Sequence, residues 1–175
     1  MNKRIITILI TIVLIGVIIY LYMKATIYLK MRMALVTALK SYPKNILESC
    51  ERIFRMETSH MTSFQFLKTW SPGMEINYNN PDPPYFGWTS LIPFWKANPQ
   101  FAPIGTYVMP ENKTGIVKTF IKFPSLDSSV MTICSKLQSN GNNPGAWYSS
   151  DPVKQAEYSA TLNQIIPKIT NEITS

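Results

Sequence analysis

The first hydrophobic feature of the chain is an apolar run from Ile5 to Met23 that contains no charged residue. As an α-helix this run would be about 28 Å long, close to the hydrocarbon thickness of a bilayer. Thr7 and Thr11 interrupt its apolar character, but their hydroxyls can bond the preceding helical turn. We therefore expect residues 1–23 to form a transmembrane anchor. A cleaved secretory signal is the alternative, but the run exceeds a usual signal and no small-residue cleavage site follows.

Helical spacing continues beyond the anchor. Apolar residues recur three or four positions apart at Ile27, Met31, Leu35, Ala38 and Tyr42, which predicts that the helix runs on until Pro43. A second pattern, from Pro43 to about Met56, places Ile46, Leu47, Cys50, Ile53 and Phe54 on one face. Glu48 with Arg52, and Glu51 with Arg55, stand four positions apart, as in ion pairs on an exposed helix face. A shorter helix is expected over residues 63–70.

Residues 71–110 hold eight of the 13 prolines of the chain, interleaved with aromatic residues. Because proline excludes long helices and central strands, we expect short turns and edge strands there. The aromatic side chains have two interpretations. They form part of the core, or they form a surface that contacts a partner protein. The candidate contact residues are Trp70, Tyr85, Phe86, Trp88, Phe94 and Trp95.

The remaining sequence predicts a β-hairpin followed by helices. β-Branched and aromatic residues at 104–109 and 115–123 flank a turn at 110–115. Helical spacing returns over residues 125–137, with Asp127 or Ser128 as the N-cap. A C-terminal helix after Ser149 carries a modest apolar stripe and is expected to pack on the hairpin; the stripe comprises Val153, Ala156, Ala160, Asn163 and Ile166.

These elements predict an α+β fold. A long N-terminal transmembrane helix continues into an amphipathic helix, and this packs on a small antiparallel sheet with additional short helices. We divide the chain into the anchor (1–23), a basic juxtamembrane helix (24–44) and a single α+β globular domain (45–175).

The net charge of +7 is confined to the membrane-proximal part of the chain. Seven of the 17 Lys and Arg precede Asn45 without any acid among them, and the other ten match the ten Asp and Glu. The seven are Lys3, Arg4, Lys24, Lys30, Arg32, Lys40 and Lys44. Basic residues at this place suit anionic lipid headgroups. A nucleic-acid-binding domain would instead need a basic face of its own, so we expect no nucleic-acid partner.

Candidate chemistry in the sequence is sparse. Cys50 and Cys134 both fall on apolar helix faces; they form either a disulfide, if the domain lies in an oxidising compartment, or two buried free thiols. His60 is the only histidine, and no metal-ligand spacing is present. Ser41 and Lys44 match a Ser-x-x-Lys pattern, which arises freely by chance. We therefore expect no catalytic site, no metal site and no cofactor.

The layout resembles type IV pilins, most nearly the type IVb class. The resemblance lies in the hydrophobic helix that runs into an exposed amphipathic one, the interruption at Pro43, and the strand-Pro-helix-Cys passage from Ile121 to Cys134. It covers most of the chain loosely. Pilins usually carry a processing Gly before the helix and a Glu at its fifth position, whereas Gly16 lies within the run and the run holds no acid. The resemblance thus implies a minor or accessory component, not a polymerising pilin.

We expect a single-pass membrane protein that acts as a structural or assembly component of a pilus or secretion-type machine, through contacts with other proteins of the same assembly. Oligomers are compatible with this function. The alternative is a membrane-tethered binding or adaptor module, such as a viral envelope protein, with an aromatic recognition surface. Counts of flanking charges give mixed indications of topology. We favour a cytoplasmic N-terminus and a domain outside the cytoplasm, as in the bacterial inner membrane and periplasm.

Overall fold

The first element of the structure is the 37-residue helix α1, Lys3–Leu39. The structure is a computed structural model, and it describes residues 3–76, 85–110 and 115–175. The chain divides after Lys30 into two compact units, and α1 begins in the first and ends in the second. In the first unit, no residue from Ile5 to Met23 is buried. This helix is long and apolar enough to cross a membrane.

The second unit, residues 31–175, begins with the last part of α1. Met31, Ala34, Leu35 and Ala38 are all fully buried in the structure. The compact unit therefore includes residues 31–44, which the sequence analysis assigned to a separate juxtamembrane helix. The reason is that their apolar face recurs at helical spacing and has the core available to cover it.

Two amphipathic helices form the centre of this unit. Helix α2, Lys44–Glu57, and helix α5, Leu126–Ser139, contact each other. The predicted apolar face of α2 is buried as expected, with Leu47, Cys50, Ile53 and Phe54 at zero exposure. Helix α5 begins one residue after Ser125, whose hydroxyl accepts a hydrogen bond from the backbone N–H of Ser128. Ser125 is therefore the N-cap, and the expectation of Asp127 or Ser128 was wrong.

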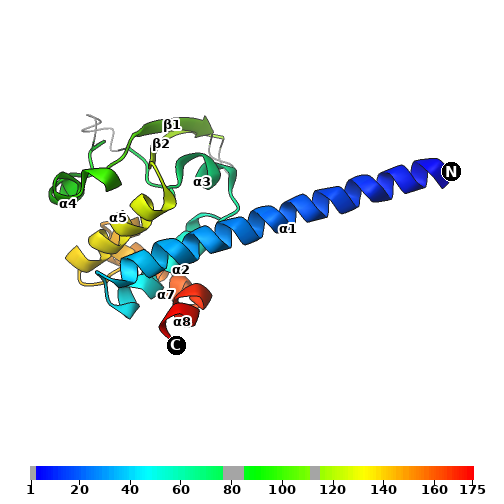
Figure 1. Ribbon diagram of the computed structural model, residues 1–175. Helices are drawn as coiled ribbons and strands as arrows, with labels where there is room; N and C mark the ends of the chain where they lie inside the picture. Colours follow the sequence, from blue (N-terminus) through cyan, green and yellow to red (C-terminus); the bar gives the residue numbers. More distant parts are fainter. Residues whose placement is uncertain (1–2, 77–84, 111–114) are drawn as a thin grey trace. The chain divides into compact units, whose positions relative to one another are not determined.

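The predicted hairpin is present as the only named sheet in the described residues. Strand β1, Gly105–Pro110, pairs in antiparallel register with β2, Val117–Lys122, so that Tyr107 lies opposite Phe120. Residues 111–114 of the predicted turn lie outside the described part of the chain. Glu75 makes an isolated bridge to Phe120 on the other side of β2. Helix α3, Phe64–Thr69, contacts both strands (Figure 1).

Between residues 85 and 103 the proline-rich segment consists of turns and short helices. It contains the 3-10 turns η1, Thr89–Leu91, and η2, Pro99–Phe101, on either side of the short helix α4, Ile92–Ala97. Of the edge strands predicted for residues 71–110, β1 and the bridge at Glu75 are present, whereas the described residues 85–103 contain no strand. Proline at the first turn of a helix costs no hydrogen bond, and both α4 and η2 use it in this position.

Three helices complete the C-terminal part of the chain. They are α6, Gly145–Tyr148, α7, Pro152–Asn163, and α8, Lys168–Thr174. Both α7 and α8 contact α2 (Figure 1), not the hairpin as the sequence analysis expected. The predicted apolar stripe is exposed: Val153 in α7 is 66% exposed, and Ile166, which follows the end of α7, is 64% exposed. The buried residues of α7 are Tyr158 and Leu162.

Candidate functional site

Two of the aromatic residues predicted to contact a partner, Phe86 and Trp95, lie in the core. Trp95 is 1% exposed and donates its indole N–H to the Thr132 hydroxyl at 3.0 Å, while its ring stacks on Tyr85. Phe86 is also buried. A buried ring whose polar atom already has a partner has no surface to offer another protein. In the structure Phe86 and Trp95 are therefore core residues, which is the first of the two interpretations.

The other aromatic candidates are half-buried and paired with rings of this chain. Trp88 stacks on Trp147 and donates its indole N–H to the Glu75 carbonyl at 2.8 Å. Phe94 stacks on Phe101, and Trp70 meets the edge of Phe66. The pair of Trp88 and Trp147 joins distant segments, the pair of Phe94 and Phe101 joins α4 to η2, and the pair of Phe66 and Trp70 lies at the end of α3. The aromatic segment thus mainly supplies packing for the fold.

Cys50 and Cys134 are brought into the same part of the core, on α2 and α5. Both are free thiols at zero exposure, and the Cys50 thiol donates to the Val130 carbonyl at 3.9 Å. Burial is the main reason that the pKa of Cys50 is raised, and the adjacent Cys134 adds to it. Of the two alternatives that the sequence left open, the structure has the free thiols.

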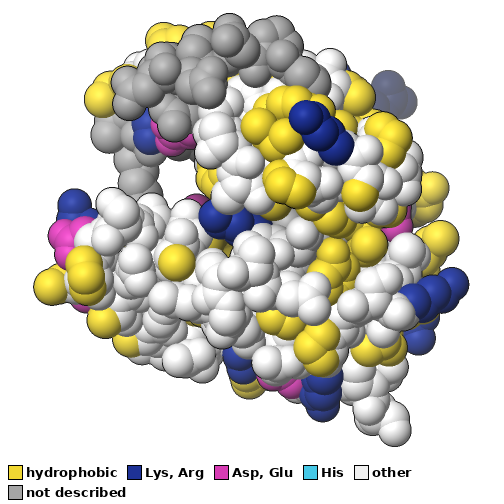
Figure 2. All heavy atoms as spheres, turned by 90° about the vertical axis from the view of Figure 1, so that its left-hand side faces the viewer, with side chains coloured by type: hydrophobic (Ala, Val, Ile, Leu, Met, Phe, Trp, Pro, Cys, Tyr) yellow, Lys and Arg dark blue, Asp and Glu magenta, His cyan; other side chains and the backbone are white. Residues whose placement is uncertain are grey.

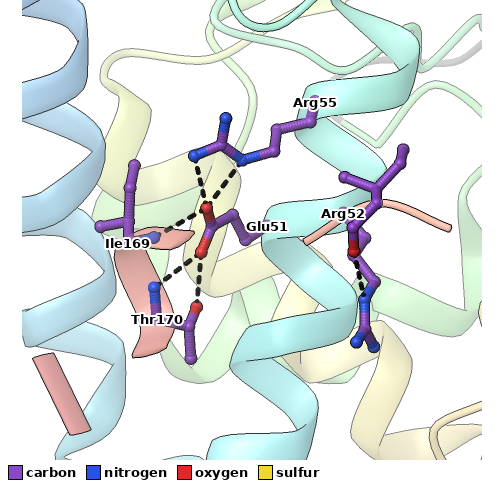
Figure 3. A network of polar contacts seen from close by, with 6 residues as sticks. Glu51, Arg52, Arg55, Ile169 and Thr170 are labelled. Carbon is purple, nitrogen blue, oxygen red and sulfur yellow. Dashed lines mark hydrogen bonds and ion pairs between the residues drawn. The ribbon is translucent and has the colours of Figure 1, made fainter. Parts of the chain in front are cut away.

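A buried polar network surrounds Glu51, in the middle of α2 (Figure 3). Its carboxylate accepts hydrogen bonds from the backbone N–H groups of Ile169 and Thr170 at 3.0 and 2.7 Å. The Thr170 hydroxyl donates to it at 2.8 Å, and Arg55 binds it at 2.7 Å. The Glu51 side chain is fully buried. It therefore caps the first turn of α8 from a different helix.

These hydrogen bonds attach the C-terminal helix α8 to α2 through Glu51. A buried carboxylate is tolerated only where donors replace the water it has lost, and here four groups do so. Arg52, the residue after Glu51, donates from Nε to the Ile165 carbonyl at 3.0 Å (Figure 3). This bond fixes the segment that leads into α8 to α2 as well. The predicted exposed pair of Glu51 with Arg55 exists as an ion pair, but it is in the core.

The sequence does not distinguish Glu51 from Glu48 for this role, because both have the same spacing to an arginine. In the structure Glu48 remains near the surface and approaches Lys44 at 3.9 Å. Nothing in the spacing of α2 distinguishes the two carboxylates. The difference is made by α8, which lies 118 residues further along the chain and reaches only one of them.

A cleft of about 690 Å³ lies between α7, the end of α2 and the hairpin. Its charged lining residues are Glu57, Glu75, Glu157 and Lys154. Glu75 forms an ion pair with Lys118 at 2.8 Å. This cleft was not predicted from the sequence, which led us to expect the C-terminal helix to pack on the hairpin.

One wall of the cleft is a tyrosine pair. Tyr148 is exposed and stacks on the buried ring of Tyr158 with centroids 4.7 Å apart. The Tyr158 hydroxyl donates to the Glu57 carboxylate at 2.7 Å. Burial raises the pKa of Tyr158 well above its usual value, and the charge of Glu57 raises it further. Tyr158 is thus a neutral hydrogen-bond donor, and Tyr148 leaves an accessible ring face in the cleft.

The seven membrane-proximal basic residues are all exposed. Four of them, Lys3, Arg4, Lys24 and Lys30, lie in the first unit, and Arg32, Lys40 and Lys44 lie in the second. On the face of the molecule in Figure 2, the Lys and Arg side chains stand apart among hydrophobic and uncharged groups. That face therefore carries no continuous basic surface of the kind that follows a nucleic-acid backbone.

The residues weighed for catalysis lie at the surface. His60 is exposed in a left-handed turn that follows α2, and Ser41 is exposed just after α1. Lys44 is half-exposed and lies near Glu48. Within residues 3–76, 85–110 and 115–175, no group of three His, Cys, Asp or Glu side chains is close enough to hold a metal ion.

Compared with models of known protein families, with curated proteins and with solved structures, the chain shows no significant match.

Proposed function

We propose that this protein is a single-pass, membrane-anchored structural or assembly component that acts by contacting other proteins. The observation that carries the proposal is the apolar surface of α1 between Ile5 and Met23. Ile8, Leu14 and Ile18 are each more than half exposed to the surroundings. So much exposed apolar area is unfavourable in water but favourable in lipid, where the helix also satisfies its own backbone groups.

The charges on either side of this run support a place at a membrane. Lys3 and Arg4 precede it and Lys24 and Lys30 follow it, so cations flank the apolar residues at both ends. Near an anionic leaflet each such cation contributes about 1 kcal/mol to membrane attachment. Fixing the compact unit to a membrane concentrates it against partners in the same bilayer, so that weak contacts suffice for assembly.

A pilus or secretion-type machine is the assembly that we propose, on the layout of the chain alone. The layout in question is an apolar helix that continues into a compact unit, together with the strand-Pro-helix passage that ends at Cys134. The apolar run Ile5–Met23 holds no Glu, which favours an accessory role over a polymerising one. We also propose that the N-terminus is cytoplasmic and the compact unit lies outside the cytoplasm.

The test is a pair of fusions after Ser175, one to a reporter active only outside the cytoplasm and one to a reporter active only inside. Both fusions are made on the full chain, and membranes are extracted with alkaline carbonate. We expect the protein to stay in the membrane pellet and the external reporter alone to be active. Release by carbonate would overturn the anchor, and an active internal reporter would overturn the proposed topology.

A second candidate function is favoured by the cleft between α7 and the hairpin. In a membrane-tethered binding module, the exposed ring of Tyr148 would supply an apolar contact and Glu157 a charge for a bound ligand. The recognition site would then be this cleft, not the aromatic segment. The test is a thermal-shift screen of the full chain in detergent micelles against small cationic and aromatic compounds. A compound that raises the Tm of the wild type but not of Tyr148→Ala would support this function.

A further inference from the structure

Among the described residues, none makes a backbone hydrogen bond to the edge of β1 that faces away from β2. The Ile76 N–H donates to the Thr119 carbonyl, and the Ile121 N–H donates to the Met74 carbonyl. The backbone groups of Thr119 and Ile121, both in β2, therefore point away from β1. Backbone groups alternate between the two edges of a strand. Lys118, Phe120 and Lys122 therefore face β1, and the Ile104 N–H bond to the Lys122 carbonyl at 2.9 Å agrees with this.

The register then determines which groups of β1 are left over. Tyr107 pairs with Phe120 and Met109 with Lys118, so these two residues of β1 direct their backbone groups toward β2. Thr106 and Val108 direct theirs to the opposite edge. Both residues are exposed, and Val108 is 58% exposed. Two N–H donors and two carbonyl acceptors are thus presented outward from the middle of the strand.

The surroundings of this edge lack the usual protection against pairing. Natural edge strands carry lysines, central prolines or bulges that prevent another strand from adding. Strand β1 has no charged residue, and Pro110 stands only at its end. Apolar side chains are exposed on and beside the hairpin at Ile104, Val108, Ile116 and Val117.

We propose that β1 pairs with β1 of a second copy of this chain, in antiparallel register about Tyr107. In this register Thr106 lies opposite Val108 of the second copy, and each pair exchanges two hydrogen bonds. The two pairs together satisfy all four outward donors and acceptors on each strand. The symmetry is two-fold, so the same surface is used by both copies and the assembly closes as a dimer.

A second copy fits this edge for reasons of charge and area. Because β1 is uncharged, self-pairing places no like charges opposite each other. The contact is a single strand with a few apolar side chains, smaller than the roughly 800 Å² per partner of a standard stable interface. Copies held in one bilayer meet at a raised effective concentration, which compensates for a small contact area. The inference thus rests on the proposed membrane anchoring and names one partner within it.

The register can be tested by disulfide cross-linking of the full chain reconstituted into liposomes. In the proposed pairing the two Tyr107 residues face each other at a non-hydrogen-bonded position, with Cα atoms about 4.5 Å apart. This separation permits a disulfide. Tyr107→Cys should therefore give a dimer on a non-reducing gel after mild oxidation with copper phenanthroline. The wild type should not, since Cys50 and Cys134 are fully buried.

Val108→Cys is the matched control. The two Val108 residues are offset by two positions, so their Cα atoms are about 8 to 9 Å apart, too far to be bridged. Val108→Lys tests the same pairing without a cross-link, and it leaves the fold intact because the side chain is exposed. We expect it to abolish the energy transfer that fluorescently labelled wild-type copies show in liposomes. Circular dichroism checks that each variant is folded.

Three results with the purified protein would overturn the inference. They are a folded Tyr107→Cys that stays monomeric, equal cross-linking by Tyr107→Cys and Val108→Cys, and energy transfer unchanged by Val108→Lys. Cross-linking of Tyr107→Cys to a different protein in native membranes would also overturn it, in favour of strand addition by another chain. Failure of the proposed anchoring is seen separately, as release of the protein by alkaline carbonate. A dimer without membrane attachment would retain this inference and reject that function.

Discussion

The apolar residues from Ile5 to Met23 and those of helices α2 and α5 are similar in kind but opposite in environment. In the first region none is buried, whereas Leu47, Ile53, Val130 and Ile133 in the second are at zero exposure. The second region has polar positions between its apolar ones, and the apolar faces of its helices pack against each other. The first is apolar on all sides, and only a surrounding apolar medium can bury it. Hydrophobicity thus identifies the residues to be buried. Its periodicity indicates whether the rest of the protein or a surrounding lipid buries them.

The largest expected effect is on the buried side of this comparison. Trp95→Ala removes a fully packed ring and leaves the Thr132 hydroxyl without its partner, so we expect a loss of about 3 to 5 kcal/mol of unfolding free energy. The measurement is denaturant unfolding of the full chain in detergent micelles. Phe64→Ala is the control, since Phe64 is 57% exposed and should cost less than about 1 kcal/mol. Equal losses would contradict the assignment of Trp95 to the core.

Glu51 sharpens the comparison because it is a charge on the buried side. Glu51→Gln keeps the shape but turns an amide N–H toward the donors of α8, so we expect a loss of about 3 kcal/mol or more. Glu48→Gln, on the same helix near the surface, should cost less than about 0.5 kcal/mol. Hydrogen exchange should show faster exchange of the Ile169 and Thr170 amides in the Glu51 variant alone. Unchanged protection of these amides would contradict the capping role.

A charge placed in the exposed apolar region should act on the membrane and not on folding. Ile12→Lys puts a cation in the middle of the run, at about 2.5 to 3.5 kcal/mol against insertion. We expect a larger fraction of the protein in the carbonate-soluble supernatant, and Ile12→Leu should behave as the wild type. The near-ultraviolet circular dichroism of the compact unit in micelles should not change. If both variants partition alike, the run is not the membrane anchor.

A smaller effect is expected where two backbones meet in the compact unit. A Cβ added to Gly145 would overlap the backbone of Gln155, so α6 and α7 can approach only because Gly145 has no side chain. Gly145→Ala should destabilise by about 1 to 3 kcal/mol through overpacking. Gly16→Ala, with no atom near its added Cβ, is the control and should leave unfolding unchanged. A neutral Gly145→Ala would contradict this close approach.

The most gradual effect is a dependence of stability on alkaline pH. Because burial raises the pKa of Tyr158 in the folded protein, the unfolded chain releases this proton first as the pH rises. The stability contributed by Tyr158 is therefore complete below about pH 10 and is lost above it, by up to about 1.4 kcal/mol per pH unit. The denaturation midpoint measured from pH 8 to 11 should fall less steeply in Tyr158→Phe. Tyr42, whose pKa is also raised, accounts for part of the remaining slope.

Much of the local structure followed from the sequence. Apolar spacing predicted α2 and α5 to within a residue or two at most ends, and the turn between β-branched runs predicted the hairpin. Short-range patterns suffice for such elements, because the residues that define them are neighbours along the chain. The spanning length of α1 was predicted in the same way, from nothing more than the absence of charge over Ile5–Met23.

Tertiary structure decided the roles of individual side chains. Glu51 and Glu48 have the same local pattern, and only the docking of α8 made one of them a buried cap. Trp95 was open to two interpretations until α5 offered Thr132 as its partner. The apolar stripe from Val153 to Ile166 was expected to face the core, but the packing of α7 on α2 buried Tyr158 and Leu162 instead. Burial depends on contacts between residues far apart in the chain, which local periodicity does not record.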